Sequence, residues 1–237
     1  MINTVLSKQQ KGFVYADNFD NYFVVTASGF SELILSNFSS FNLNDFLDFV
    51  SNNSDIPIYI HIYSALPEVT RLFNNDNRFN TKNRERVSMR VNTSENKFSG
   101  QSCLSNYQLS QIDGSNYEEA NALKPGMIDN FWNSKEHFLQ NGYGLLMTED
   151  NDAVGICYSA AVSDNISEID ILTKEEYRGK GIADILTKEY VFLSKKLNIT
   201  PNWDCFSDNL ASLNTAKKNK FETIKTYQLL SIYNTQR

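Results

Sequence analysis

EIDILTKEEYRGKGIADIL, residues 168–186, is the stretch that decides the fold. Its first part alternates apolar and acidic residues, as a half-buried strand does. Ile182, Ile185 and Leu186 then recur at helical spacing, as the buried stripe of an amphipathic helix does. The tetrapeptide RGKG, residues 178–181, lies between them. The stretch therefore predicts a strand, a basic turn with two glycines and a helix in direct succession.

A turn of this kind suits a bound phosphate group. A helix start offers unpaired N–H groups and the positive end of the helix dipole, and glycines let a ligand approach the backbone closely. The nucleoside triphosphatase pattern GxxxxGK[ST] is absent, and the dinucleotide pattern GxGxxG fails because only Gly179 and Gly181 are present. The turn therefore predicts a pyrophosphate site. A nucleotide-hydrolysing enzyme that uses RGKG as its phosphate cradle ranks third among the functions we consider.

The predicted elements around this stretch give the fold class. Their order is strand, two helices, three strands, helix, strand, helix, strand, and it predicts an α+β fold of α/β/α type, with helices on both faces of a mixed, mostly antiparallel sheet. The predicted ranges are Tyr107–Gln111, helices across 117–140, Tyr143–Thr148, Val154–Val162, Ser167–Leu172, Gly181–Leu197, Asn202–Phe206, Leu210–Lys218 and Thr223–Tyr233.

Residues 1–95 form a smaller α+β unit in this interpretation. The polar, turn-rich segment 92–104 is the best candidate for a boundary, so the second domain spans residues 105–237. Three roles stay open for the first domain: completing the substrate pocket, covering a sheet edge, or forming a homodimer contact.

Composition excludes several classes of protein. The chain has 237 residues, a net charge of −6 and a pI near 5.0, with no run of Lys and Arg, which argues against a nucleic-acid partner. No stretch reaches the roughly 20 apolar residues that span a bilayer, so we expect no membrane partner and a cytoplasmic protein. Cys103, Cys157 and Cys205 form no CxxC pair, and His61 and His137 are widely separated, so we expect neither a disulfide framework nor a metal site.

At these residues the chain resembles the GNAT superfamily of acyl-CoA N-acyltransferases. The R/Q-x-x-G-x-G/A motif is matched by Arg178, Gly181 and Ala183, and the downstream N-x-x-A/S-x-x-L-Y-x-K-x-G-F element by Asn209, Ser212, Lys218 and Phe221. The resemblance implies acetyl-CoA as co-substrate, without a metal. It places the pantetheine arm beside the strand and the pyrophosphate on the turn, through Ile171, Leu172, Thr173, Arg178, Gly179, Lys180, Gly181, Ile182, Ala183, Asp184, Asn209 and Ser212.

Two positions depart from the family pattern. Ala216 stands where many members carry a tyrosine acid, and Lys220 stands where a glycine usually precedes Phe221. A tyrosine acid therefore cannot be carried over to position 216. The segments EIDI, YRGKGIA and PNWDC also resemble a bacterial branch that includes zwittermicin-type self-resistance acetyltransferases, which implies inactivation of an antibiotic.

Acetyl transfer to an amine requires a base, because an amine with a pKa near 10 must lose a proton before it attacks. Glu168 and Asp170 share one face of a predicted central strand, where carboxylates are costly unless they are paired or face a wet cleft. In several family members the base lies five residues before the motif Asn, a place that Asp204 occupies here. Our order of preference for the catalytic base is Asp204, Glu168, Asp170, and a purely structural role stays open for each.

The acid that protonates the departing thiolate is not identified by the sequence. Tyr227, Tyr233, Ser212, Thr215 and solvent stay open. We expect Cys157 and Cys205 to be buried packing residues, which disfavours an acyl-cysteine route.

The leading hypothesis is an N-acetyltransferase acting on a primary amine of a small molecule or a peptide, and the acidic balance favours a cationic acceptor. The alternative is a non-catalytic acetyl-CoA-binding sensor or interaction module, which Ala216 and Lys220 favour.

Overall fold

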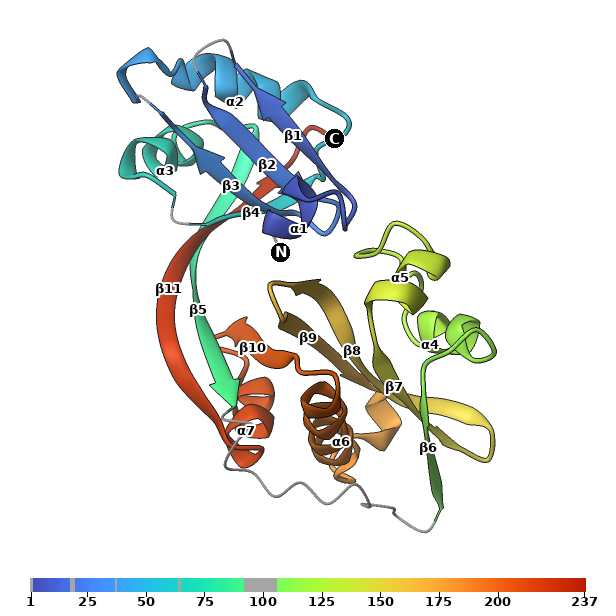
Figure 1. Cartoon of the computed structure of the whole chain (residues 1–237). Helices are drawn as coiled ribbons and strands as arrows, with labels where there is room; N and C mark the ends of the chain where they lie inside the picture. Colours follow the sequence, from blue (N-terminus) through green and yellow to red (C-terminus); the bar gives the residue numbers. More distant parts are fainter. Residues whose placement is uncertain (1, 18–19, 37, 64, 92–105) are drawn as a thin grey trace. The chain divides into compact units, whose positions relative to one another are not determined.

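The computed structural model describes residues 2–17, 20–36, 38–63, 65–91 and 106–237. The chain divides into two compact units (Figure 1). Unit 1 contains Met1–Arg86 and Thr226–Arg237, and unit 2 contains Val87–Lys225. The sequence assigned the last strand wholly to the second domain, whereas this division gives the end of that strand to unit 1. The predicted boundary at residues 92–104 lies outside the described residues.

Unit 1 is built on strands that run in the order β1-β2-β3-β4-β11-β5. β3 and β4 are parallel, whereas β1 with β2, β2 with β3, and β4 with β11 are antiparallel. The strands are β1 (Gly12–Ala16), β2 (Tyr22–Thr26), β3 (Phe30–Ile34), β4 (Tyr59–Tyr63), and parts of β5 (Phe79–Val91) and β11 (Phe221–Asn234), which continue into unit 2. The helices are α1 (Ile2–Leu6), α2 (Leu43–Asn52) and α3 (Pro67–Asn74), with a 3-10 turn at Phe38–Ser40.

The core of unit 1 forms because β2 and β4 alternate. Phe23 and Val25 of β2 pack with the buried residues of α2 and α3, whereas Val24 packs with Ile2 and Val5 of α1 on the other face. His61 of β4 is a buried strand residue, and its Nδ1 lies 2.8 Å from Ser231 Oγ. His61 falls in an alternating segment of the sequence, Ile56–Tyr63, which predicts a strand at this position.

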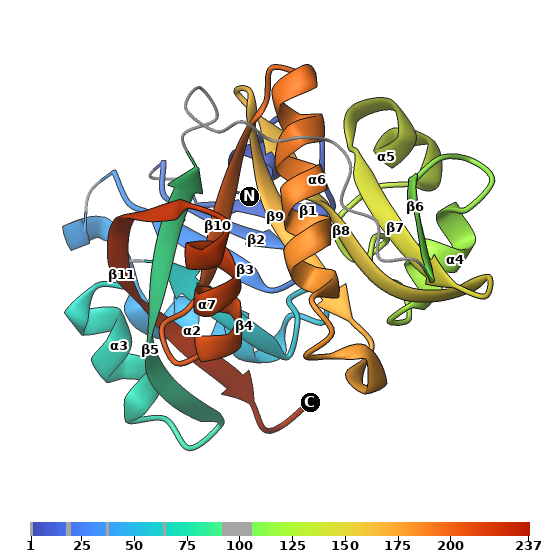
Figure 2. The ribbon, with the colours of Figure 1, turned by 90° about the horizontal axis from the view of Figure 1, so that it is seen from below.

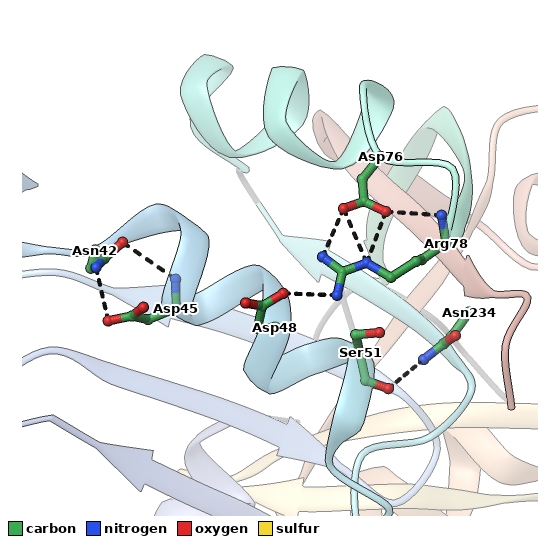
Figure 3. Close-up of polar contacts among 7 residues, drawn as sticks. All are labelled: Asn42, Asp45, Asp48, Ser51, Asp76, Arg78 and Asn234. Atoms are coloured by element: carbon green, nitrogen blue, oxygen red, sulfur yellow. Dashed lines mark hydrogen bonds and ion pairs between the residues drawn. The ribbon is translucent and has the colours of Figure 1, made fainter.

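Polar side chains fasten both ends of α2 (Figure 3). Asn42 caps its start by accepting hydrogen bonds from the N–H groups of Asn44 and Asp45, and Asn234 donates to the carbonyl of Ser51 near its end. Beside the helix, Arg78 Nη1 lies 2.7 Å from Asp48 Oδ1, and Arg78 Nη2 lies 2.7 Å from Asp76 Oδ2. The hydrogen bonds from Arg78 hold the pKa of Asp76 below its usual range.

Unit 2 contains the strands β10-β9-β8-β7-β6 in that order, antiparallel except for the β9–β10 pair. The strands are β6 (Tyr107–Gln111), β7 (Gly144–Glu149), β8 (Asp152–Ser163), β9 (Ile166–Thr173) and β10 (Thr200–Phe206). The helices are α4 (Tyr117–Ala122), α5 (Lys135–Asn141), α6 (Ile182–Lys196) and α7 (Leu210–Lys218), with a 3-10 turn at Glu175–Tyr177.

Helices cover both faces of this sheet. On one face, Tyr117 and Phe138 of α4 and α5 pack with Tyr158 of β8. On the other face, Leu186 and Tyr190 of α6 pack with the strands, and Figure 2 shows α6 lying along β8 and β9. Cys157 and Cys205 are free and buried, as expected. The predicted α+β class and the mixed, mostly antiparallel sheet are confirmed.

Three local predictions were incomplete. The short helix α1 was not predicted, and alternation predicts a strand over Ile56–Tyr63, whereas β4 begins at Tyr59. The helical region 117–140 is interrupted between α4 and α5, where Pro125 and Gly126, with its φ of 67°, break the helix. In the part of the chain that the structure describes, no helix is long and apolar enough to cross a bilayer, and no group of three His, Cys, Asp or Glu side chains could hold a metal ion.

Candidate active site

The basic turn is open at both of its glycines. Gly179 and Gly181 have φ angles of 76° and 82°, in the left-handed region that favours glycine. A Cβ at either position would meet no atom within 4 Å. The backbone of the turn is therefore accessible to a ligand.

The start of α6 lacks a side-chain cap. Gly181 is its N-cap residue and supplies no capping hydrogen bond. The N–H groups of the first helical turn point along the axis without an intrahelical partner, and they carry the positive end of the helix dipole. Ile182, with 1% of its surface exposed, anchors this end of the helix in the core beside the half-buried Ala183. The geometry suits an anionic group at the turn.

The two cations of the turn lie at its surface. Arg178 is 64% exposed and lies 3.9 Å from Glu175, so this surface ion pair contributes little to stability. The ammonium of Lys180 lies 4.4 Å from the centre of the Tyr177 ring. Both side chains can therefore turn toward an incoming anion at small cost.

β9 precedes this turn and β10 precedes α7, and the two strands separate partway along their length. β9 and β10 pair only at Ile166 with Thr200, Ser167 with Pro201, and Glu168 with Asn202. Both strands then continue, to Thr173 and to Phe206. Beyond Glu168, the β9 backbone of residues 169–173 is not part of this pairing with β10, and an extended amide-bearing chain could pair with it there.

Glu168 lies at the point of separation and is held by a polar chain. Asn202 donates from Nδ2 to Glu168 Oε2 at 2.7 Å, and Ser88 Oγ donates to Asn202 Oδ1 at 3.3 Å. Asn202 and Ser88 are 6% and 7% exposed. The carboxylate is fixed by a buried amide, and no positive charge takes part in these two bonds.

Asp170 is held by the hydroxyl of a buried tyrosine. Its Oδ2 lies 2.9 Å from the Tyr158 hydroxyl, which also lies 2.8 Å from the carbonyl oxygen of Met127. Burial raises the pKa of Asp170, although the hydrogen bonds from Tyr158 and from the Ile171 N–H oppose the shift. Asp170 therefore keeps its proton to a higher pH than an ordinary carboxyl.

The Asp204 side chain lies on the same face of the sheet as Glu168 and Asp170. It follows Asn202 by two residues on β10, and Asn202 pairs with Glu168, so side chains at 202 and 204 point to the face that carries Glu168 and Asp170. Asp170 and Asp204 each lie two residues beyond the last paired residue of their strand. Sequence reasoning chose three carboxyls that the fold brings to one face, at the separation of β9 and β10.

α7 is capped and anchored by the downstream motif residues. Asn209 accepts a hydrogen bond from the Ser212 N–H at 3.2 Å, and Ser212 Oγ accepts one from Trp203 Nε1 at 3.0 Å. Both side chains therefore stabilise α7 in this structure. Ala216 is fully buried in the cluster that contains Trp203 and Phe221, which explains why a small residue is accommodated there.

Asp184, predicted at the pyrophosphate turn, has its side chain engaged with other residues. Its Oδ2 lies 3.1 Å from Lys188 Nζ and 3.1 Å from Lys218 Nζ, and its Oδ1 accepts from Asn219 Nδ2 at 2.8 Å. Burial favours protonation, but the contacts from Lys218, Lys188 and Asn219 together hold its pKa below the usual range.

The candidate acids are divided between the two units. Tyr227 and Tyr233 belong to unit 1, where the Tyr227 ring lies 5.8 Å from Tyr63 and Tyr233 pairs with Tyr59. Thr215 donates its hydroxyl to the carbonyl of Ala211. Sequence reasoning did not single out Tyr158, Asn202 or Lys188. Alternation along β10 could have indicated Asn202, because it lies two residues from Asp204.

Comparisons with known proteins identify the family of the chain. The sequence profile of the GNAT acetyltransferase family matches residues 1–230, so the match includes most of unit 1 as well as unit 2. The uncharacterized N-acetyltransferase YdfB of Bacillus subtilis strain 168 is 31% identical over 121 residues. This match spans 51% of this chain and 46% of the relative, which is less than half the length of that protein.

Solved structures share the fold. A GCN5-related N-acetyltransferase-like protein from Streptococcus suis 89/1591 superposes with a TM-score of 0.72 at 18% identity, over 94% of this chain and 88% of that chain. A GNAT-family protein from Novosphingobium aromaticivorans DSM 12444 gives a TM-score of 0.64 at 12% identity, over 99% of this chain and 95% of that chain.

Proposed function

Since the chain belongs to the GNAT acetyltransferase family, we propose that it transfers an acetyl group from acetyl-CoA to a primary amine of a small molecule or a peptide. The observation that carries the proposal is the combination of an open turn at Gly179 and Gly181 with two strands that separate just before it. Such a site offers N–H groups to a pyrophosphate and strand backbone to an amide-bearing arm.

The residues that would hold acetyl-CoA follow from these features. The N–H groups of the turn and of the first turn of α6 would bind the pyrophosphate, and Arg178 and Lys180 would add positive charge. The backbone of Ile171, Leu172 and Thr173 would pair with the pantetheine arm. A backbone N–H in the separated part of β9 would polarise the thioester carbonyl.

The base is one of the three carboxyls on the shared face. Asp204 remains our first candidate, because it occupies the place five residues before Asn209 that the family resemblance gives to the base. Glu168 is second, since Asn202 engages its Oε2, and Asp170 is third. Each could accept the proton of the amine directly or through one water molecule. For the proton of the departing thiolate, we propose solvent as the simplest source, with Tyr227, Tyr233, Ser212 and Thr215 as the alternatives.

The same three carboxyls favour a cationic acceptor. They gather negative charge on one face of the sheet, in a chain whose net charge is −6. A basic amine from an antibiotic, handled in the cytoplasm as in the zwittermicin-type branch, fits this charge. The support for that branch is the sequence pattern of EIDI, YRGKGIA and PNWDC alone.

Two parallel measurements test the proposal. Calorimetric titration measures acetyl-CoA binding, and a thiol-release assay measures transfer to a panel of cationic and neutral primary amines. The proposal expects binding together with amine-dependent release that is faster on cationic amines. Binding without release on any amine would favour the non-catalytic sensor, and absence of binding would overturn both.

A further inference from the structure

Lys188, Lys218 and Asp184 form an ion cluster next to the open turn. The two lysines are not among the residues that we propose for the pyrophosphate. Lys188 and Lys218 each place Nζ 3.1 Å from the same oxygen, Asp184 Oδ2. Lys188 comes from the second turn of α6 and Lys218 from the last turn of α7. The two helices meet here through Asn219, which donates to Asp184 Oδ1 at 2.8 Å.

The cluster carries an excess of positive charge. One carboxylate neutralises one ammonium, so the two lysines and Asp184 sum to a charge of +1. Asp184 is 15% exposed, whereas Lys188 and Lys218 are 42% and 65% exposed. Each ammonium has three donors and uses one of them on Asp184 among the described residues. Both ammonium groups stabilise the Asp184 carboxylate, and both are exposed enough to reach a ligand as well.

The two lysines lie close to the start of α6, which follows the open turn. Asp184 is the third residue of α6, counted from Ile182, and helical side chains lean toward the N-terminus of their helix. Lys188 therefore leans over the first turn of α6, where Asp184 lies. Lys218 reaches the same turn from the end of α7. Both ammonium groups thus lie beside the helix end whose backbone faces the proposed pyrophosphate.

We propose that Lys188 and Lys218 form a binding subsite for the 3′-phosphate on the ribose of acetyl-CoA, an inference that rests on the proposed function. Asp184 holds the two ammonium groups together, and their remaining N–H donors bind the phosphate oxygens. A phosphate monoester carries up to two negative charges near neutral pH, so it matches two cations better than one. The subsite makes the enzyme prefer acetyl-CoA over its 3′-dephospho form.

The test compares acetyl-CoA with 3′-dephospho-acetyl-CoA by calorimetric titration. We expect the wild-type protein to bind acetyl-CoA about tenfold or more tightly than the dephospho form. In the double variant Lys188→Gln/Lys218→Gln, acetyl-CoA binding weakens to the level of the dephospho form, whose own affinity changes less than about twofold. Raising the salt concentration reduces the wild-type preference, because these groups are partly exposed.

Matched variants separate this subsite from general surface charge. Lys195→Gln removes a cation from the last turn of α6, and Lys217→Gln removes the neighbour of Lys218 on α7. Both variants should still bind acetyl-CoA more tightly than 3′-dephospho-acetyl-CoA, to the same degree as the wild-type protein. Circular dichroism and the affinity for dephospho-acetyl-CoA report whether each variant is folded.

The outcomes distinguish the two proposals. If neither ligand binds the wild-type protein, the proposed function fails. If both bind with equal affinity, or if the double variant keeps the full preference for acetyl-CoA, the subsite alone is overturned.

Discussion

Two ion clusters, one in each unit, have opposite compositions. In unit 1, the single cation Arg78 binds two carboxylates, Asp76 and Asp48. In unit 2, the single carboxylate Asp184 binds two cations, Lys188 and Lys218. Arg78 directs its planar fork into bidentate contacts with Asp76 and holds the segment before β5 against α2 (Figure 3). In the described part of the chain, Lys188 and Lys218 each form one ion pair, with Asp184 Oδ2.

This difference in composition indicates that one cluster stabilises the fold and the other binds a ligand. The unit 1 cluster uses the donors of its cation on the protein itself, so we infer that it serves folding. The unit 2 cluster keeps donors and positive charge beside an open helix start, so we infer that it serves a ligand. The comparison predicts that substitutions in the Asp184 cluster and at the three carboxyls of unit 2 change binding or turnover, whereas substitutions in the Arg78 cluster of unit 1 change stability.

The largest expected effect is on turnover. Asp204→Asn should lower kcat by about 100-fold or more, because it removes the proposed base, while the Kd for acetyl-CoA changes less than about twofold. Single-turnover acetylation of a cationic amine measures the effect across pH. A kcat unchanged at every pH would remove Asp204 as base, and Glu168→Gln and Asp170→Asn, assayed in parallel, would show which carboxyl replaces it.

The second effect is a loss of unit 1 stability in acid. Burial, followed by the charges of Arg86 and Arg84, lowers the pKa of His61 from 6.5 to about 4. The unfolded chain therefore binds the proton more readily between these values, and stability falls as the pH drops from about 6.5 to about 4. We expect a loss of about 2–3 kcal/mol, measured by urea unfolding with circular dichroism. His61→Gln should flatten this part of the pH profile, and an equal slope in the variant would refute the assignment.

The third effect separates the Arg78 cluster from an ordinary surface pair. Arg78→Met should destabilise unit 1 by about 1–2 kcal/mol, because two carboxylates lose their partner. The matched control is Arg71→Met, which removes a helix-surface pair with Glu68 in which Arg71 is 70% exposed, and it should cost less than about 0.5 kcal/mol. Urea midpoints measure both, and a Kd for acetyl-CoA that shifted with Arg78→Met would break the division between the units.

The smallest effect is a stabilisation. Lys220 has a φ of 65° where the family pattern has glycine, so its backbone is strained. Lys220→Gly should stabilise unit 2 by about 1 kcal/mol, whereas Lys220→Ala, which retains a Cβ, should not. Thermal unfolding compares the two. Equal shifts for both variants would show that the side chain, and not the backbone, sets the stability.

Short-range periodicity made much of unit 2 predictable. Alternation in Ser167–Leu172 assigned Ile169 and Ile171 to one face and Glu168 and Asp170 to the other, and the clusters around α6 bear this out. Glycines at 179 and 181 located the open turn, because few other residues adopt their φ angles.

Long-range pairing could not be predicted. The partners Asn202 for Glu168 and Tyr158 for Asp170 depend on strand register, which alternation within one strand does not determine. The same limit applies to Asp184. Its place after the glycines indicated a ligand contact, but Lys218, which engages its carboxylate, lies 34 residues later and meets it only through helix packing.

Amide hydrogen exchange with and without saturating acetyl-CoA tests the central claim most directly. We predict slower exchange in residues 178–186 and in the separated parts of β9 and β10, with no change in α2 of unit 1. Unchanged exchange across residues 178–186, with acetyl-CoA bound as judged by calorimetry, would contradict the assignment of the turn as its binding site.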